Sequence, residues 1–292
     1  MKNKIIDILI IALIYCLMFA SYIFLNSFLN INDIIIKLFV VAIIWTIYLW
    51  LFGLLFKNIF VYQLFWYIGP LFFVLVYLKK ITELNAQSYL IVGCLGFWTI
   101  KSVINLLIRF QNFSIKDWRQ TYFENKYQKK WFLFNLFCCH IIPTIIIYFA
   151  IIPIFYYIDF STTMNINLST MIGLLIMGFG VIIEMVSDQQ MNRFKRKSNN
   201  PSEINRIGLW KNSRHPNYLG EIMVWWGAYL MMLSLVENKF LLFLGPLLVT
   251  LLILIISIPL VEKREKELKP EYEEYIENTN MLLIFPKKSK SV

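Results

Sequence analysis

Eight long apolar stretches constrain the fold of this chain more than any other feature. They occupy approximately residues 5–29, 34–56, 59–78, 86–108, 131–158, 168–187, 219–236 and 240–261. A helix of about 20 apolar residues crosses a hydrocarbon core of about 30 Å, and it pairs its own backbone polar groups inside lipid. We therefore predict an all-α, polytopic membrane helix bundle of about eight transmembrane helices, within a range of roughly seven to ten.

The composition supports one integral membrane domain over residues 1–292. Charged residues make up 16% of the chain and hydrophobic residues 59%, whereas soluble domains carry about 25% charge. The N-terminal apolar run is longer than a signal-peptide core, so we expect a retained helix. The four cysteines lie in apolar segments without the spacing of a disulfide framework or metal site. We expect them to be small, buried core residues, and we expect no metal.

The basic residues indicate the orientation of the chain. The formal net charge is +10, but the bases lie in short segments between apolar runs, which argues against nucleic-acid binding. With a cytoplasmic N-terminus, 23 of them fall on the cytoplasmic side and 3 on the other. We therefore predict that both termini are cytoplasmic. The protein would lie in the cytoplasmic membrane of a bacterium or in the endoplasmic reticulum of a eukaryote.

Polar residues inside the apolar stretches are candidates for function. Lys37 lies early in its stretch, and we expect it to snorkel to the interface. Lys101 lies deeper and is a candidate site residue. For His140 we expect a core histidine bonded to a backbone carbonyl. Pro143 and Pro153 predict a kinked or broken fifth span, and Gly245-Pro246 predicts a distortion of the last one.

The most polar stretch beside an apolar run is Gly208–Glu221. Pro216 suits the first turn of a helix, and the residue before a proline is pushed towards an extended conformation. The helix should therefore begin near Pro216. Asn217 and Glu221 then share one face, with Tyr218 close by.

Bases precede this predicted helix start. Lys211 and Arg214 come just before it, where free N–H groups and the helix dipole already favour an anion. We predict a polar pocket at the membrane surface that suits a phosphate-bearing ligand.

Two further segments carry polar chemistry on the predicted cytoplasmic side. In residues 109–123, a short interfacial helix could present Asp117, Trp118, Arg119 and Tyr122 together, although such a helix could also simply lie on lipid headgroups. At the end of the sixth span, a continuous helix would align one polar stripe, made of Glu184, Asp188, Asn192 and Lys195. Because the following loop is short, we expect the polar ends of the sixth and seventh spans to lie near each other. We expect the tail after Glu262 to be helical and residues 281–286 to fold back against the bundle.

Several of these segments resemble a known family. Gly208–Glu221 followed by Trp225-Trp-Gly227 looks like the signature of the DUF1295 membrane proteins, in the steroid 5-alpha-reductase C-terminal domain superfamily. Lys116–Arg119, Ser187–Gln190 and Ser257–Glu262 resemble further family elements in the same order, so the likeness covers about residues 30–290. Lys116 and Gln120 depart from the family's Glu and Tyr, which leaves the substrate-side acid open.

The resemblance implies an all-α membrane reductase that uses NADPH to reduce an activated carbon–carbon double bond. Its substrate would be lipid-like: a steroid, sterol, isoprenoid or enoyl compound. The cofactor half would lie at about 168–290, with cofactor-binding residues Asp188, Arg193, Lys195, Arg214, His215, Asn217, Tyr218, Glu221, Arg264 and Tyr275. Catalytic candidates are Tyr218, Tyr122 and Glu221, with a phenol as the expected type of proton donor. Substrate-side candidates are Lys101, Asp117, Trp118 and Arg119.

Two alternatives remain open. Integral membrane methyltransferases that use S-adenosylmethionine also carry an Arg-His-Pro-x-Tyr-x-Gly motif, and a non-catalytic protein that binds membrane lipids would share the same apolar pattern. The continuation Asn217–Glu221 and the double Trp favour the reductase. Nothing in the sequence indicates an oligomeric state.

Overall fold

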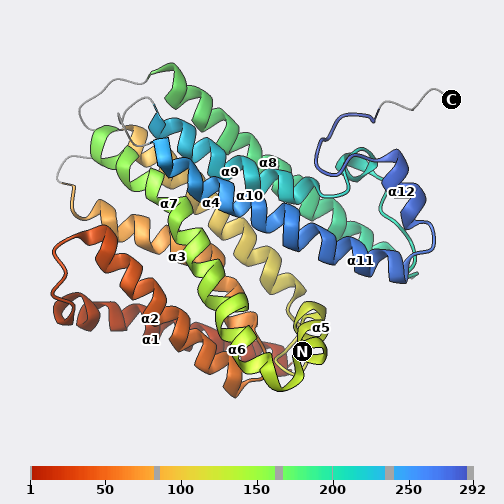
Figure 1. Cartoon of the computed structure of the whole chain (residues 1–292), viewed down its shortest axis with the longest axis horizontal. Helices are drawn as coiled ribbons and strands as arrows, with labels where there is room; N and C mark the ends of the chain where they lie inside the picture. The colour runs from red at the N-terminus through yellow and green to blue at the C-terminus, as the bar shows by residue number, and fades with distance from the viewer. Residues whose placement is uncertain (1, 82–85, 162–166, 199, 234–239, 288–292) are drawn as a thin grey trace. The chain divides into compact units, whose positions relative to one another are not determined.

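The computed structural model describes residues 2–81, 86–161, 167–198, 200–233 and 240–287, and every named element in these ranges is a helix (Figure 1). The chain divides into two compact units. The first comprises Met1–Leu84 and Trp98–Phe155, and the second comprises Asn85–Phe97 and Tyr156–Val292. The cofactor half predicted at 168–290 therefore falls in the second unit.

Within the described ranges, seven helices are long and apolar enough to cross a membrane. They are Asn3–Phe28, Ile34–Leu55, Phe60–Leu78, Ser88–Arg109, Trp118–Phe160, Leu168–Lys197 and Leu241–Leu268. The chain is thus an integral, multi-pass membrane protein, as predicted. The stretch 219–236 is not among the seven. Its helix, α9 (Pro216–Leu233), has 18 residues and carries Asn217 and Glu221 in its first turns, and residues 234–236 lie outside the described ranges.

The first unit is built from α1 to α3, the second half of α4, α5, α6 and the larger part of α7. Asp33 caps α2 by accepting the N–H groups of Ile35 and Ile36 at 2.8 and 3.0 Å. The Trp45 ring lies in the core of the unit and packs against aromatic rings of α3, with a centroid distance of 4.8 Å to Phe72. The helices are α1 (Lys2–Phe28), α2 (Ile34–Leu55), α3 (Phe60–Leu78), α4 (Ala86–Arg109), α5 (Trp118–Tyr127), η1 (Gln128–Lys130), α6 (Trp131–Leu136), η2 (Phe137–Ile141) and α7 (Ile142–Ser161).

The second unit centres on the pair α8 and α9, which lie side by side (Figure 1). After α9 the chain forms one long, interrupted helix and then a short terminal one. The elements are α8 (Leu168–Lys197), η3 (Gly208–Lys211), η4 (Phe240–Phe243), α10 (Leu244–Leu251), η5 (Leu252–Ser257), α11 (Ile258–Leu268) and α12 (Tyr272–Asn278).

Glycines allow α8 and α9 to pack with their backbones almost in contact. A Cβ atom on Gly173 would lie 2.7 Å from the carbonyl oxygen of Gly227, and one on Gly180 would lie 2.7 Å from that of Gly220. Small residues at such crossings let membrane helices approach closely, which increases their van der Waals contact. The spacing of the glycines places both crossings on one face of each helix.

Two π-helical segments interrupt the apolar helices just before prolines. η2 precedes Pro143 and η5 precedes Pro259. Because proline has no N–H and its ring clashes with the preceding turn, the helix widens locally at these points. The interruption predicted at Pro143 is therefore a widened turn, whereas α7 continues through Pro153. The last span is widened before Pro259. It is also irregular beside Gly245-Pro246, where the 3-10 turn η4 (Phe240–Phe243) changes to the α-helix α10, in line with the predicted distortion.

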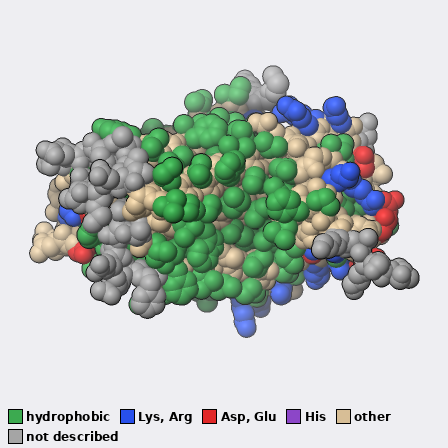
Figure 2. Space-filling view, turned by 90° about the horizontal axis from the view of Figure 1, so that it is seen from above, with side chains coloured by type: hydrophobic (Ala, Val, Ile, Leu, Met, Phe, Trp, Pro, Cys, Tyr) green, Lys and Arg blue, Asp and Glu red, His purple; other side chains and the backbone are tan. Residues whose placement is uncertain are grey.

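Two predictions about residues in the spans are tested by burial. His140 is fully buried, and its Nδ1 lies 2.8 Å from the Asn135 carbonyl oxygen, as expected of a core histidine. The prediction that the cysteines are buried is wrong: Cys16 and Cys138 are exposed, and the other two are half-buried. A surface that faces lipid is as apolar as the protein interior. The apolar residues around a cysteine therefore do not show whether it faces lipid or lies in the core. Hydrophobic side chains cover most of the face shown in Figure 2, and Lys and Arg gather towards its edges.

Candidate functional site

The polar stripe predicted at the end of the sixth span lies on one continuous helix. α8 runs without interruption for 30 residues. Burial falls steadily along the stripe: Glu184 is 4% exposed, Asp188 is 8% exposed, Asn192 is half-buried and Lys195 is exposed. The stripe therefore leads from an exposed cation to buried carboxylates.

This stripe meets the start of α9 at Gly220. A Cβ atom on Gly220 would lie 2.6 Å from the Gly180 carbonyl oxygen and 2.7 Å from the backbone nitrogen of Glu184. Glu184 thus packs directly against the turn of α9 that carries Glu221, which is itself 8% exposed. The prediction that the polar ends of the two spans lie near each other is confirmed.

The loop before α9 is fastened to α8 by side chains. The Trp210 indole N–H donates to the Ser187 carbonyl at 3.0 Å, and the Leu209 N–H donates to Gln190 Oε1 at 2.9 Å. Gly208 adopts a φ of 63°, and a Cβ atom there would collide with the Gln190 side chain. Glycine at position 208 therefore satisfies both the left-handed backbone and the close approach.

Arg214 and His215 share one carboxylate partner from α11. Arg214 Nε donates to Glu262 Oε1 at 2.7 Å, and His215 Nε2 lies 3.0 Å from the same oxygen. Arg214 Nη1 also donates to the backbone carbonyls of Ile276, at 3.2 Å, and Thr279. Since Arg214 is only 7% exposed, it joins the start of α9 to the C-terminal tail.

Backbone hydrogen bonds complete this junction. The Arg214 N–H donates to the Asn280 carbonyl at 2.9 Å, and the Asn280 N–H donates to the Asn212 carbonyl at 3.1 Å. The Ser213 hydroxyl donates to the Leu282 carbonyl at 2.8 Å. The tail therefore folds back against residues 212–215, which confirms the expectation for 281–286.

Tyr275 closes the same junction from α12. Its hydroxyl donates to the carbonyl of Trp210 and to that of Ser213, the latter at 3.3 Å. Burial raises the pKa of Tyr275 above its ordinary value, against the opposing effect of Arg214 and Arg206. The phenol is therefore protonated at neutral pH and serves as a hydrogen-bond donor.

The structure thus brings together part of the predicted cofactor set. Arg214, His215 and Tyr275 meet at the tail, and the Tyr218 ring stacks near that of His215, with centroids 5.6 Å apart and planes at 25°. The others are spread along α8, α9 and α11: Asp188 and Glu221 are buried, Asn217 and Arg264 are half-buried, and Arg193 and Lys195 are exposed.

Glu262 is the residue of this network that the sequence did not identify. It appeared only as the last residue of the segment Ser257–Glu262, where the final span ends. Its position as the first charged residue after an apolar run is the signal that could have identified it, because a buried basic residue needs a carboxylate partner.

The substrate-side candidates lie in the first unit. Asp117 caps α5, accepting the Arg119 N–H at 2.8 Å, and its two carboxylate oxygens pair with the Arg119 guanidinium at 3.1 and 3.2 Å. The short helix predicted in 109–123 therefore begins only at Trp118, immediately after its cap. Tyr122 on α5 and Lys101 on α4 are half-buried.

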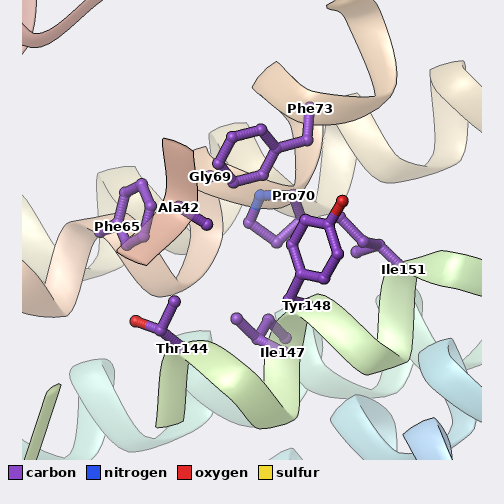
Figure 3. Close-up of a pocket in the computed structure, with 9 residues that line it drawn as sticks. All are labelled: Ala42, Phe65, Gly69, Pro70, Phe73, Thr144, Ile147, Tyr148 and Ile151. Atoms are coloured by element: carbon purple, nitrogen blue, oxygen red, sulfur yellow. The ribbon is translucent and has the colours of Figure 1, made fainter. Parts of the chain in front are cut away.

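A small apolar cavity lies beside α3 and α7 in this unit (Figure 3). Phe73 and Ile147 are among the side chains around it, and Thr144 and Tyr148 are lining residues that carry a hydroxyl. Its volume of about 10 Å³ accommodates at most one water molecule. The cavity is therefore a packing space and not a ligand site.

Comparison with known proteins identifies the family. No curated protein matches the chain, and no solved structure does. A family model described as "Protein of unknown function (DUF1295)" matches residues 49–279, which include α8, α9 and the network around Glu262. Since this match covers most of the chain, the protein is a member of the DUF1295 family.

Proposed function

We propose that this protein is an integral membrane reductase that uses NADPH to reduce an activated carbon–carbon double bond in a lipid-like substrate. The observation that carries the proposal is the contact of two polar faces inside a membrane protein. Glu184, the most buried residue of the stripe on α8, packs at Gly220 against the turn Asn217–Glu221 of α9. Polar residues are maintained within membrane helices where they serve a site.

The order of side chains along these helices fits a dinucleotide. Arg193 and Lys195 are exposed cations at the end of α8, and cations of this kind bind phosphates through charge-assisted hydrogen bonds. The amide of Asn217 and the carboxylate of Glu221 are suited to hold a nicotinamide carboxamide. When bound there, NADPH would supply the hydride.

The remaining residues of the set would position the site. Glu262 fixes the His215 ring, and Tyr218 lies next to that ring. The phenol of Tyr218 is of the type that can donate a hydrogen bond to the oxygen that becomes negative as the double bond is reduced. We propose Tyr218 as that donor. Arg214 and Tyr275 hold the tail that forms the outer wall.

A thermal-shift titration of the purified protein tests the proposal. NADPH at about 100 times its Kd should stabilise the fold by about 2.7 kcal/mol. The variants Asn217→Ala and Glu221→Gln should lose most of this shift, whereas Glu277→Gln, which changes an exposed carboxylate on α12, should keep it.

The same titration separates the alternatives. Stabilisation by S-adenosylmethionine and not by NADPH would replace the reductase with a methyltransferase. If neither ligand stabilises the protein, both enzymatic functions are refuted and a non-catalytic lipid-binding protein is left.

A further inference from the structure

A cavity of about 150 Å³ lies in the first unit, between the start of α3, the end of α4 and the segment that leads into α5. A cavity needs a volume of about 10–15 Å³ to hold a single water molecule, so this cavity has room for a polar group of several atoms. Its polar lining includes Asn58, Gln63, Arg109, Lys116, Asp117 and Arg119. These residues belong to neither the α8–α9 contact nor the tail junction.

Buried amides hold the walls of this cavity in place. The Asn58 side chain donates to the carbonyls of Phe113 and Ile115 at 3.0 and 3.1 Å. From the other side, Gln120 accepts the Ile59 N–H at 3.1 Å. Asn58 and Gln120 are each only 2% exposed. The loop before α3 and the segment before α5 therefore form one fixed wall.

The charge of the lining favours an anion. The lining contains three cationic side chains, Arg109, Lys116 and Arg119, and one carboxylate, Asp117. Outside the lining, Lys116 Nζ pairs with Glu124 at 2.7 Å. The Arg119–Asp117 and Lys116–Glu124 pairs are partly exposed, and ion pairs of this kind contribute only about 0–1 kcal/mol. A phosphate group can therefore recruit both cations, and an arginine can bind it through two parallel hydrogen bonds.

The position of the cavity points to a lipid as the source of that phosphate. The membrane-crossing helix Ser88–Arg109 ends at the cavity wall. Just before this end, Ile104 and Ile108 are 51% and 48% exposed, and Ile115 in the lining is 51% exposed. Apolar side chains beside a basic cavity at a helix end match the two parts of a phospholipid, its acyl chains and its charged headgroup.

We propose that this cavity binds the phosphate group of an anionic phospholipid. The binding does not depend on NADPH. Lipid binding is therefore measured without the cofactor. If no lipid binds, the proposed reductase activity is unaffected.

The test is a thermal-shift titration of the full-length protein in detergent with phosphatidylglycerol, phosphatidylcholine or inorganic phosphate. Wild type should be half-saturated by phosphatidylglycerol at a concentration about tenfold lower than by either other compound. The double variant Lys116→Gln with Arg119→Gln should weaken phosphatidylglycerol binding about tenfold or more, because it removes two cations that donate charge-assisted hydrogen bonds to the phosphate. The matched control is Lys129→Gln with Lys130→Gln, which removes two exposed cations of η1 outside the cavity and should leave the affinity unchanged.

Three results would overturn the proposal. Equal binding of phosphatidylglycerol and phosphatidylcholine by wild type would overturn it. This comparison needs no variant, so it stands even if the cavity variant fails to fold. An equal loss in the cavity and control variants would reduce the effect to net charge. Half-saturation by inorganic phosphate at the same concentration as the lipid would identify free phosphate as the ligand.

Discussion

Two glycines of α8 offer a direct test of its packing against α9. A Cβ atom on Gly180 would lie 2.7 Å from the Gly220 carbonyl oxygen and 3.0 Å from the Val224 backbone nitrogen, whereas one on Gly178 would meet nothing within 4 Å. Backbone atoms cannot rotate away as a side chain can. We therefore expect Gly180→Ala to force the two helices apart and Gly178→Ala to be accommodated without movement.

The expected magnitude follows from two opposing effects. Replacing glycine by alanine inside a helix adds about 0.8–1.0 kcal/mol of helix propensity, and it does so in both variants. Overpacking adds a penalty of typically 1–3 kcal/mol only at position 180. Gly180→Ala should therefore be about 1–3 kcal/mol less stable than Gly178→Ala, and the latter should be at least as stable as wild type.

The assay is thermal unfolding of both variants and wild type in one detergent at one scan rate. For domains of 150–250 residues, 1 kcal/mol corresponds to about 2–4 °C in Tm, so the two variants should differ by several degrees. Because α8 displacement would also move Glu184 away from Gly220, the NADPH-induced shift proposed above should shrink in Gly180→Ala alone. If Gly180→Ala melts at or above the temperature of Gly178→Ala, the close backbone contact described here is wrong.

Two further predictions concern the tail junction. Glu262→Gln should lower the free energy of unfolding by about 3–5 kcal/mol, because it leaves the buried Arg214 without its carboxylate. The control Glu271→Gln breaks an exposed ion pair and should change the Tm by less than the equivalent of about 1 kcal/mol. Equal losses of Tm in the two variants would contradict this reasoning. Burial raises the folded-state pKa of Tyr275 above the ordinary 10.0, so its contribution is complete below pH 10.0 and is lost as the pH rises towards the folded-state pKa. Wild type should therefore lose Tm more steeply than Tyr275→Phe in a series of melts above pH 10.0, and parallel curves would refute the effect.

Local sequence was enough to predict much of the helical fold. A proline after a polar loop marks the start of α9, because its missing N–H and fixed φ suit a first turn, and the structure begins this helix at Pro216. The stripe from Glu184 to Lys195 followed from helical periodicity alone. By contrast, the apolar sequence around Cys16 and Cys138 led us to assign them to the core, although they are exposed. Lipid and protein interior are equally apolar, so hydropathy is the same for both.

The candidate site was predictable only in part, for a similar reason. The motif around Arg214 and His215 was visible as a run of polar residues beside a helix start. Its partner Glu262 lies 48 residues further along the chain from Arg214, and no local rule connects the two positions. The tail residues at 280–282 that complete the junction have no charge that would have indicated their pairing.

The sequence by itself determined that this is a multi-pass, all-helical membrane protein, because long apolar stretches in lipid must satisfy their backbone hydrogen bonds within helices. It also determined which polar residues share a helix face, since that depends on periodicity alone. Only the tertiary structure decided which faces meet: the absence of a side chain at Gly180 and Gly220 brings Glu184 of α8 against the start of α9. It also decided that Arg214 and His215 face Glu262 and the C-terminal tail. A buried charge is stable only beside a partner, and here the chain places that partner on a different helix.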